Sequence, residues 1–253
     1  MHQKLGIATR FWGLTEGDVQ RLATWVDAAL NIVPAENVYV AVDTETDLSG
    51  SLDFMRKQYP EITAFLVAPW GKVVHAPNAI LSKSAEHQVK FLLFASSEYP
   101  VTPSLVSLIQ SHCDERTLVV GARLLPHDFK APSGESVLIE DASGLQIPWN
   151  TYALWSTEHL IHTGFVLAAD SLQDPDNAGM EEMGTIAAQQ ILWPGSASAK
   201  LVTPQEGDLV VNTHGWNIKR KERYIYNLES KNSRSTAQIE RLKLPRPSVL
   251  HIG

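Results

Sequence analysis

The chain has 253 residues, of which 44% are hydrophobic and 19% charged, so it can bury one substantial core but cannot form three independent domains. Its net charge of −7 argues against general nucleic-acid binding, and its single cysteine, Cys113, excludes a disulfide framework and a multi-thiolate metal site. The lone thiol, the short apolar runs and an N-terminus without a secretory-signal pattern together predict a cytoplasmic protein.

Short β-rich runs alternate with helical patterns in the first half of the chain, which is typical of crossover units and a largely parallel sheet. Thr15 is followed by Asp18, and this spacing predicts a helix with a capping box at its start. Two more helices are expected, one over residues 78–89 and one that begins at Thr102. The expected strands are residues 4–10, 38–42, 62–67, 91–94 and 118–122.

The second half is less regular, because Pro and Gly after Arg123 predict loops or a short hairpin before order returns at Trp155. A helix is expected over 179–190, and strands over 200–202 and 209–211. Toward the C-terminus, residues 219–246 carry nine Lys and Arg against three Glu. Such a segment is typically a solvated helix, and the alternative is contact with anionic phosphates or a membrane surface. We divide the chain into residues 1–218 and a basic, partly helical extension over 219–253.

The best-known catalytic motifs are missing from the sequence, which contains no Walker loop, GxGxxG, GxSxG or HExxH. In open α/β sheets, ligands bind beyond the carboxyl ends of the strands, so the residues there are the first candidates for a site. They are Thr9-Arg10, Asp43-Thr44, Pro69-Trp70 and Ser96-Ser97-Glu98.

These strand ends resemble those of the GT-A type nucleotide-sugar glycosyltransferases, in particular the inverting bacterial enzymes that build polysaccharides and glycolipids. The resemblance covers about residues 4–218 and implies an α/β, Rossmann-like fold with a mixed, mostly parallel sheet flanked by helices. It places Thr9 and Arg10 under the nucleoside and makes Asp43 the residue that binds the base. On the sequence alone, Asp43 is equally well explained as a turn residue after a strand.

The resemblance extends to the groups that would bind the donor diphosphate. Lys72 lies in a Gly-containing loop and is placed to reach a phosphate, and Ser96, Ser97 and Glu98 stand where the family has its Asp-x-Asp metal motif. Three interpretations remain open. Either Glu98 and His214 hold Mg²⁺ or Mn²⁺, or a cation is dispensable and Lys or Arg neutralises the diphosphate. A third view is that 96–98 is simply a polar strand end.

The acceptor side is the most specific part of the resemblance, because an aromatic run, a Gly-containing turn and an acidic pair occur in the family's order. The family's pattern makes Glu182 the general base and Glu181 its neighbour. The structural alternative is that both are first-turn acids favoured by the helix dipole. The remaining residues that we assign are Trp155, His162 and Gly164 at the acceptor, and Lys219 and Arg220 at the leaving group.

The resemblance implies a glycosyltransferase that moves a sugar from a nucleotide-diphosphate donor to a saccharide or lipid-linked hydroxyl, with inversion. We expect no nucleic-acid partner, and the basic extension is a candidate for peripheral membrane contact. The alternative is a GT-A-like binding or scaffold module without turnover, which Ser96 in place of an Asp would explain. A sugar-phosphate nucleotidyltransferase is less well supported, because Phe11-Trp12-Gly13-Leu14 is not the Gly-rich basic signature of that class.

Overall fold

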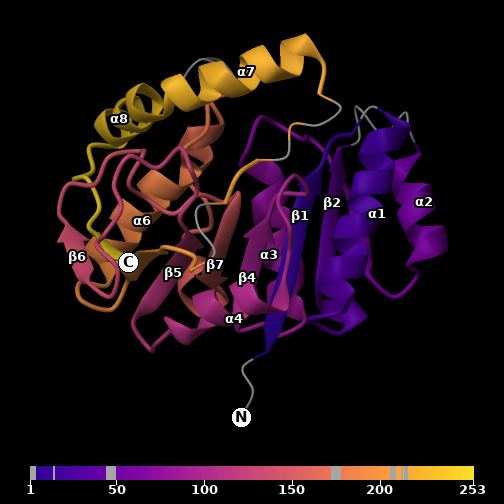
Figure 1. Cartoon of the computed structure of the whole chain (residues 1–253), viewed down its shortest axis with the longest axis horizontal. Coiled ribbons are helices and arrows are strands. Elements are labelled where there is room, and N and C mark those ends of the chain that lie inside the picture. Colours follow the sequence, from indigo (N-terminus) through magenta and orange to yellow (C-terminus); the bar gives the residue numbers. More distant parts are fainter. Residues whose placement is uncertain are drawn as a thin grey trace.

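A single mixed sheet lies at the centre of the molecule, with helices packed around it (Figure 1). The computed structural model describes residues 4–13, 15–43, 50–171, 178–205, 209–211, 213 and 216–253. In these residues, nine strands pair in the order β3-β2-β1-β4-β7-β5-β8-β9-β6. All neighbouring strands are parallel except where β7 pairs with β4 and β5 and where β6 pairs with β9. The mixed, mostly parallel α/β sheet expected from the sequence is therefore confirmed.

The strands and helices alternate along most of the chain, as crossover connections require. The strands are β1 (Leu5–Phe11), β2 (Val38–Asp43), β3 (Thr63–Val67), β4 (Phe91–Ala95), β5 (Thr117–Ala122), β6 (Ser136–Ile139), β7 (Tyr152–Ser156), β8 (Ser198–Val202) and β9 (Val249–Ile252). The α-helices are α1 (Glu16–Leu30), α2 (Ser51–Gln58), α3 (His75–Glu86), α4 (Pro103–Ser111), α5 (Thr157–Leu160), α6 (Glu181–Leu192), α7 (Ile218–Glu229) and α8 (Lys231–Leu242), and 3₁₀ turns occupy Ala35–Asn37 and Leu167–Asp170.

The predicted start of the first helix is confirmed in detail. The Thr15 hydroxyl accepts from the Asp18 N–H at 3.2 Å, and the Asp18 carboxylate accepts from the Thr15 N–H at 3.3 Å. This reciprocal pair satisfies backbone donors that the first turn of a helix leaves without partners. It also fixes Asp18 in the first turn of α1, where Arg220, far along the chain, binds it.

The chain order of the sheet reverses between β1 and β4, because β2 and β3 lie on one side of β1 and β4 lies on the other. At such a switch point the two connections leave in opposite directions and open a crevice beyond the carboxyl ends of the strands. Both β1 and β4 are almost entirely buried, so their polar ends emerge from a rigid apolar core. The topology therefore holds Thr9-Arg10 and Ser96-Ser97-Glu98 next to each other.

Several elements differ from those expected. Residues 152–156 form β7, a fully buried antiparallel strand, where only a return of order at Trp155 was expected. The run has no polar alternation because both faces of the strand are covered. The strand expected over 209–211 is wrong in the described residues, since Leu209 makes only an isolated bridge to Leu124. Helix α2 and strand β9 were not predicted.

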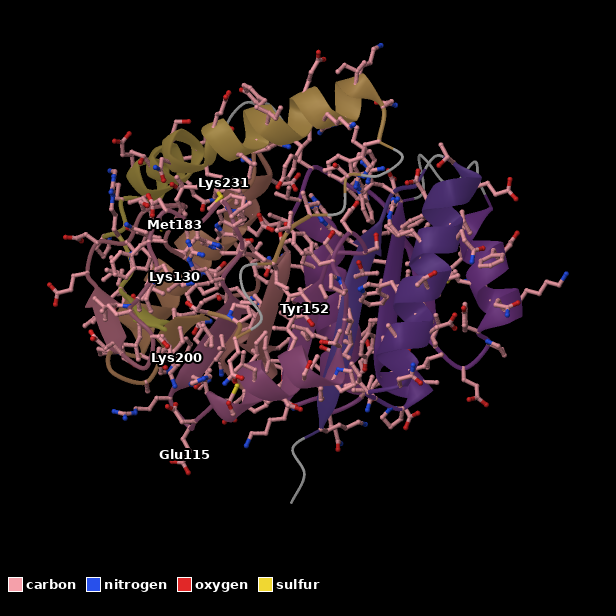
Figure 2. All side chains as sticks on the ribbon, viewed as in Figure 1. Glu115, Lys130, Tyr152, Met183, Lys200 and Lys231 are labelled. Atoms are coloured by element: carbon pink, nitrogen blue, oxygen red, sulfur yellow. The ribbon has the colours of Figure 1, made fainter. Side chains whose placement is uncertain are left out.

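The C-terminal segment contributes to the same sheet as the rest of the chain. Its helices α7 and α8 run along the top of the molecule in Figure 1, above the carboxyl ends of the parallel strands, and the chain then descends to β9 between β8 and β6. Figure 2 labels Lys231, the first residue of α8, just below this helix. None of the helices in the described ranges is long and apolar enough to cross a membrane.

The placement of β9 predicts that the last residues take part in cooperative folding. Val249 is fully buried between β8 and β6, so Val249→Ala should lower the free energy of unfolding by about 1–3 kcal/mol in urea titrations followed by circular dichroism. Leu138→Ala, on exposed β6 surface, is the control and should change it by less than about 0.5 kcal/mol. An unchanged midpoint for Val249→Ala would show that β9 lies outside the cooperative unit.

Candidate functional site

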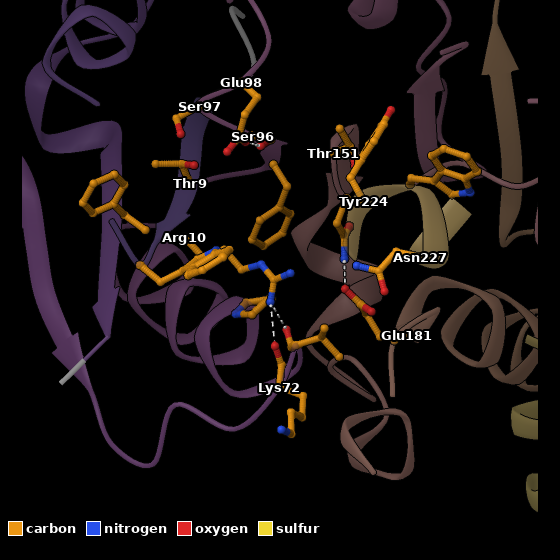
Figure 3. A pocket seen from close by; sticks show the side chains of 18 of the residues that line it. Thr9, Arg10, Lys72, Ser96, Ser97, Glu98, Thr151, Glu181, Tyr224 and Asn227 are labelled. Atoms are coloured by element: carbon orange, nitrogen blue, oxygen red, sulfur yellow. Dashed lines mark hydrogen bonds between the residues drawn. The ribbon is translucent and has the colours of Figure 1, made fainter. Parts of the chain in front are cut away.

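A cavity of about 540 Å³ opens at the switch point, beyond the carboxyl ends of β1 and β4. Figure 3 shows its two sides, with Thr9, Ser96, Ser97 and Glu98 from the N-terminal strands facing Glu181 and Asn227. The structure thus brings together most of the residues selected from the sequence. Those that line the cavity are Thr9, Arg10, Asp43, Lys72, Ser96, Ser97, Glu98, Glu181, Glu182 and Arg220.

Four of the other selected residues, Trp155, His162, Gly164 and Lys219, do not line this cavity. Trp155 is fully buried in β7, where its indole N–H donates to the Asn150 side-chain oxygen at 2.8 Å. His162 packs against Trp193, with ring centroids 5.0 Å apart. Gly164 and Lys219 also lie outside the lining, Lys219 on the exposed side of α7. His214 lies outside the described residues.

The end of β1 provides one orphaned hydroxyl and one guanidinium with a structural task. The Thr9 hydroxyl is buried in the cavity wall and has no hydrogen-bond partner in the described part of the chain. Buried polar groups are nearly always bonded, so this hydroxyl suits a ligand. Arg10 instead donates to the backbone carbonyls of Lys72 and Val73, at 3.2 and 3.3 Å (Figure 3). Arg10 therefore holds the loop after β3 against β1.

A buried carboxylate from the second half of the chain organises the same loop. Asp170 accepts the backbone N–H groups of Lys72, Val73 and Val74 at 2.8–3.1 Å, at the start of α3. Burial alone would raise the pKa of Asp170, but these bonds outweigh it and hold the pKa below its ordinary value. Gly71 must be glycine here, since its φ is +68° and a Cβ would lie 2.5 Å from an Asp170 oxygen. The loop that carries Lys72 is thus pre-formed.

The acidic pair opens α6, at the wall opposite the strand ends. Gly179 and Met180 have left-handed backbone angles, with φ of 95° and 62°, and turn the chain so that both carboxylates point inward. Glu181 and Glu182 are 5% and 4% exposed. Asn150 binds them both, its backbone N–H donating to Glu182 at 2.7 Å and its side-chain amide to Glu181 at 3.1 Å. The pair is therefore buried, held in place and part of the cavity lining.

Cations from α8 balance this pair. Lys231 extends over the Trp149 ring at 3.9 Å from its centre, and its charge favours ionised Glu182. Arg234 donates to the carbonyls of Ala178 and Asn227 at 2.6 and 2.7 Å, and its charge interacts with both carboxylates. Burial and the charge of Glu181 nevertheless dominate, and they raise the pKa of Glu182 well above its ordinary range.

No protein-family model and no curated protein matches the sequence, but solved structures do. A mannosyltransferase from Pyrobaculum calidifontis, solved with GDP-mannose and Mn²⁺, is 15% identical with a TM-score of 0.52, and the match covers 95% of this chain and 75% of that one. Glucosyl-3-phosphoglycerate synthase from Mycobacterium tuberculosis, solved with Mn²⁺, UDP and phosphoglyceric acid, is 10% identical with a TM-score of 0.50, covering 92% and 79%.

The fold is of the GT-A type. The expected resemblance is confirmed at this level. A third match, 4-diphosphocytidyl-2C-methyl-D-erythritol synthase from Anaerococcus prevotii, is 11% identical with a TM-score of 0.50, covering 88% of this chain and 96% of that one. Nucleotide-sugar glycosyltransferases and nucleotidyltransferases thus share this GT-A architecture, so the reaction must be argued from the site.

The two GT-A glycosyltransferases above were solved with Mn²⁺, so the fit of this chain to a divalent cation has to be tested. Both oxygens of Glu98 are already engaged, one by Arg220 at 2.6 Å and the other by the Ser96 hydroxyl. The described residues contain no group of three or more His, Cys, Asp or Glu side chains that could hold a metal. Mg²⁺ and Mn²⁺ require several hard oxygen donors, and the described residues do not offer them at Glu98.

The C-terminal helices form a wall of the cavity that sequence reasoning missed. Helix α7 has no buried residue, yet its inner face lines the cavity, and α8 continues that wall. Lys219 and Arg220 were selected from this segment, and of these two Arg220 lines the cavity. The charge excess of residues 219–246 was a usable signal, but it did not say which cations face inward. Lining residues not selected as site residues include Trp12, Arg21, Trp149, Asn150, Arg223, Tyr224, Asn227, Lys231 and Arg234.

The role of Asp170 is testable by stability measurements. Asp170→Asn should lower the free energy of unfolding by about 1–3 kcal/mol at neutral pH, because three backbone donors lose an ionised acceptor. The folded-state pKa lies below the unfolded value of about 3.9, so this contribution is complete above that pH and disappears as the pH falls through the folded-state pKa. Wild type and variant should therefore converge in acid.

The matched control for this measurement is Asp53→Asn, on the exposed surface of α2, which should change the free energy of unfolding by less than about 0.5 kcal/mol at any pH. A constant difference between wild type and Asp170→Asn from neutral pH into acid would show that the carboxylate charge does not hold the loop.

Proposed function

We propose that this chain is a glycosyltransferase that moves a sugar from a nucleotide-diphosphate donor to a hydroxyl of a saccharide or lipid-linked acceptor, with inversion. The observation that carries the proposal is the buried pair Glu181–Glu182, which faces the ends of β1 and β4 across one cavity of a GT-A type fold. A carboxylate facing the strand ends is what a direct displacement at a bound sugar requires.

The strand-end side of the cavity supplies groups for a donor. Asp43 is buried at the end of β2 and lines the cavity, where its carboxylate can accept an N–H of a nucleobase. Thr9 offers the unbonded hydroxyl described above. Lys72 lies on the loop that Asp170 and Arg10 hold, within reach of a phosphate. These three residues would orient the donor with its diphosphate toward the basic helix α7.

The opposite side supplies the base. In the proposed step the acceptor oxygen forms a bond to the anomeric carbon, the acceptor proton passes to Glu182, and the carbon–oxygen bond to the diphosphate breaks with its electron pair leaving on the nucleoside diphosphate. A raised pKa makes Glu182 a stronger base than a free carboxylate, and Asn150 keeps its orientation fixed. Attack from the face opposite the leaving group gives inversion.

The proposal is tested by incubating the full chain with a panel of nucleotide-diphosphate sugars and candidate saccharide or lipid-linked acceptors, and measuring release of the nucleoside diphosphate. Acceptor-dependent release with one donor would support the proposal. Tight donor binding without release in the presence of any acceptor would favour a binding module. Release of pyrophosphate from a nucleoside triphosphate and a sugar phosphate would favour a nucleotidyltransferase.

Glu182→Gln should abolish transfer, with at least a ~100-fold loss of kcat, because an amide cannot take the acceptor proton. Donor affinity should stay within about twofold, since the side chain keeps its size. Glu181→Gln leaves the base in place and should retain measurable transfer.

The wild-type rate should rise with pH through the raised pKa of Glu182, and so at higher pH than for a free carboxyl group. Steady-state kinetics measure the pH dependence of the wild type and the loss of kcat in Glu182→Gln, and calorimetry measures the donor affinity. Unchanged turnover in Glu182→Gln would remove this residue as the base.

A further inference from the structure

Arg220 contacts the segment Ser96-Ser97-Glu98, which the sequence resemblance aligns with the metal motif of GT-A enzymes. It extends from α7 into the cavity and reaches the residues that follow β4, where its Nη2 donates to Glu98 at 2.6 Å. Its Nη1 donates to Asp18 of α1 at 3.1 Å. The guanidinium therefore joins three elements that are far apart in the sequence, at the point where the carboxyl ends of the strands meet the cavity.

Two aromatic rings fix the guanidinium in place. Its central carbon lies 4.5 Å from the centre of the Trp216 ring and 5.5 Å from that of Trp12. Cations are attracted to such ring faces, and the planar group is restrained by them. Among the described residues, two N–H groups of Arg220 donate to the carboxylates, and a guanidinium has five. The side chain is 23% exposed, so the remaining N–H groups can reach a ligand in the cavity.

The carboxylates around Arg220 are themselves arranged as anchors. Arg21 and the Thr15 hydroxyl also bind Asp18. Burial alone would raise the pKa of Asp18, but these bonds, together with Arg220, lower it to about 2. Asp18 therefore stays ionised at any working pH. The positive charges of Arg21 and Arg220 balance the negative charges of Asp18 and Glu98. Arg223, which lies 5.9 Å from the Trp12 ring centre, adds further positive charge to the cavity lining.

A divalent cation does not suit the same place. A metal bound to Glu98 would lie about 2.1 Å from a carboxylate oxygen. Arg220 already lies 2.6 Å from one of these oxygens, and the Ser96 hydroxyl occupies the other. Two cations sharing one carboxylate repel each other, and Glu98 is the only carboxylate in the Ser96-Ser97-Glu98 strand end. A guanidinium, in contrast, matches the geometry of phosphate oxygens and can donate two parallel hydrogen bonds.

We propose that the guanidinium of Arg220 takes the place of a divalent metal at the donor diphosphate, so that this cavity binds nucleoside diphosphates without metal. The inference rests on the proposed function, because it assigns a role at the donor that this function requires. The ligand class is a nucleoside diphosphate, alone or linked to a sugar. Glu98 and Asp18 orient Arg220, and the diphosphate binds its remaining N–H groups.

The experiment is calorimetric titration of the full chain with UDP, GDP, CDP, ADP and dTDP, once in EDTA and once with Mn²⁺. The expected result is that one nucleotide binds with the same affinity, within about twofold, in both buffers. Arg220→Met should weaken this binding about 10- to 100-fold in either buffer, the usual range for lost charge-assisted hydrogen bonds. Arg220→Lys keeps the charge but loses the planar donor pair, and should lie in between.

Lys221→Met is the matched control, because it removes one positive charge from the next residue of α7, which does not line the cavity. It should bind like wild type. Titration of Mn²⁺ alone gives a second readout. The wild type should take up Mn²⁺ weakly, and Glu98→Gln should leave that uptake unchanged. Thermal unfolding of every variant verifies the fold, and the comparison of wild type in the two buffers does not depend on any variant.

The outcomes separate the inference from the function on which it rests. Binding that requires Mn²⁺ overturns the role of Arg220 and still supports a nucleotide-sugar enzyme. Metal-independent binding that survives Arg220→Met also overturns it. No binding of any nucleotide in either buffer overturns the proposed donor site and the inference with it.

Discussion

Two carboxylates buried side by side, Glu181 and Glu182, impose the constraint on which the rest of this site depends. Leaving one ionised carboxylate in an apolar interior costs several kcal/mol, and a second one adjacent to it raises that cost. The molecule offsets it with the two donors of Asn150 and with Lys231 and Arg234 from α8. The acidic pair and the cations of α8 thus stabilise each other at this wall of the cavity.

The same arrangement connects the two ends of the chain. Once α8 is held against the acidic pair, α7 is directed across the carboxyl ends of the strands, where Arg220 meets Asp18 and Glu98. Helix α7 buries none of its residues, and its contacts with the N-terminal half in the described residues include these ion pairs, the Trp12 ring against Arg220 and a side-chain hydrogen bond between Tyr224 and Tyr99. The segment that closes the cavity therefore also adds positive charge to it, through Arg220, Arg223, Lys231 and Arg234. A ligand that competes for Arg220 would act on both.

In the proposed function, the cavity separates two chemical tasks. Its strand-end side carries groups that suit a nucleotide, of which Thr9 and Asp43 are fixed by rigid strands and Lys72 by a loop that Asp170 pre-forms. The other side carries the carboxylate with the raised pKa. Groups on rigid elements keep their geometry when a ligand arrives, which favours a site that orients reactants rather than one that remodels around them.

Sequence patterns were sufficient for local features whose cause is local. Apolar runs with polar ends predicted β1 to β5, the Thr15–Asp18 spacing predicted the start of α1, and the acidic pair was expected at the start of α6, where it lies. Beyond these, only tertiary structure could decide the outcome. It gave Glu98 an arginine partner, buried Trp155 away from the cavity, inserted β7 and β9 into the sheet, and selected Arg220 rather than Lys219 from neighbouring cations. The physical reason is that the sequence specifies the chemical type of each side chain, whereas contacts between distant segments decide which partner it binds. Asp18 and Arg220, some two hundred residues apart, are an example.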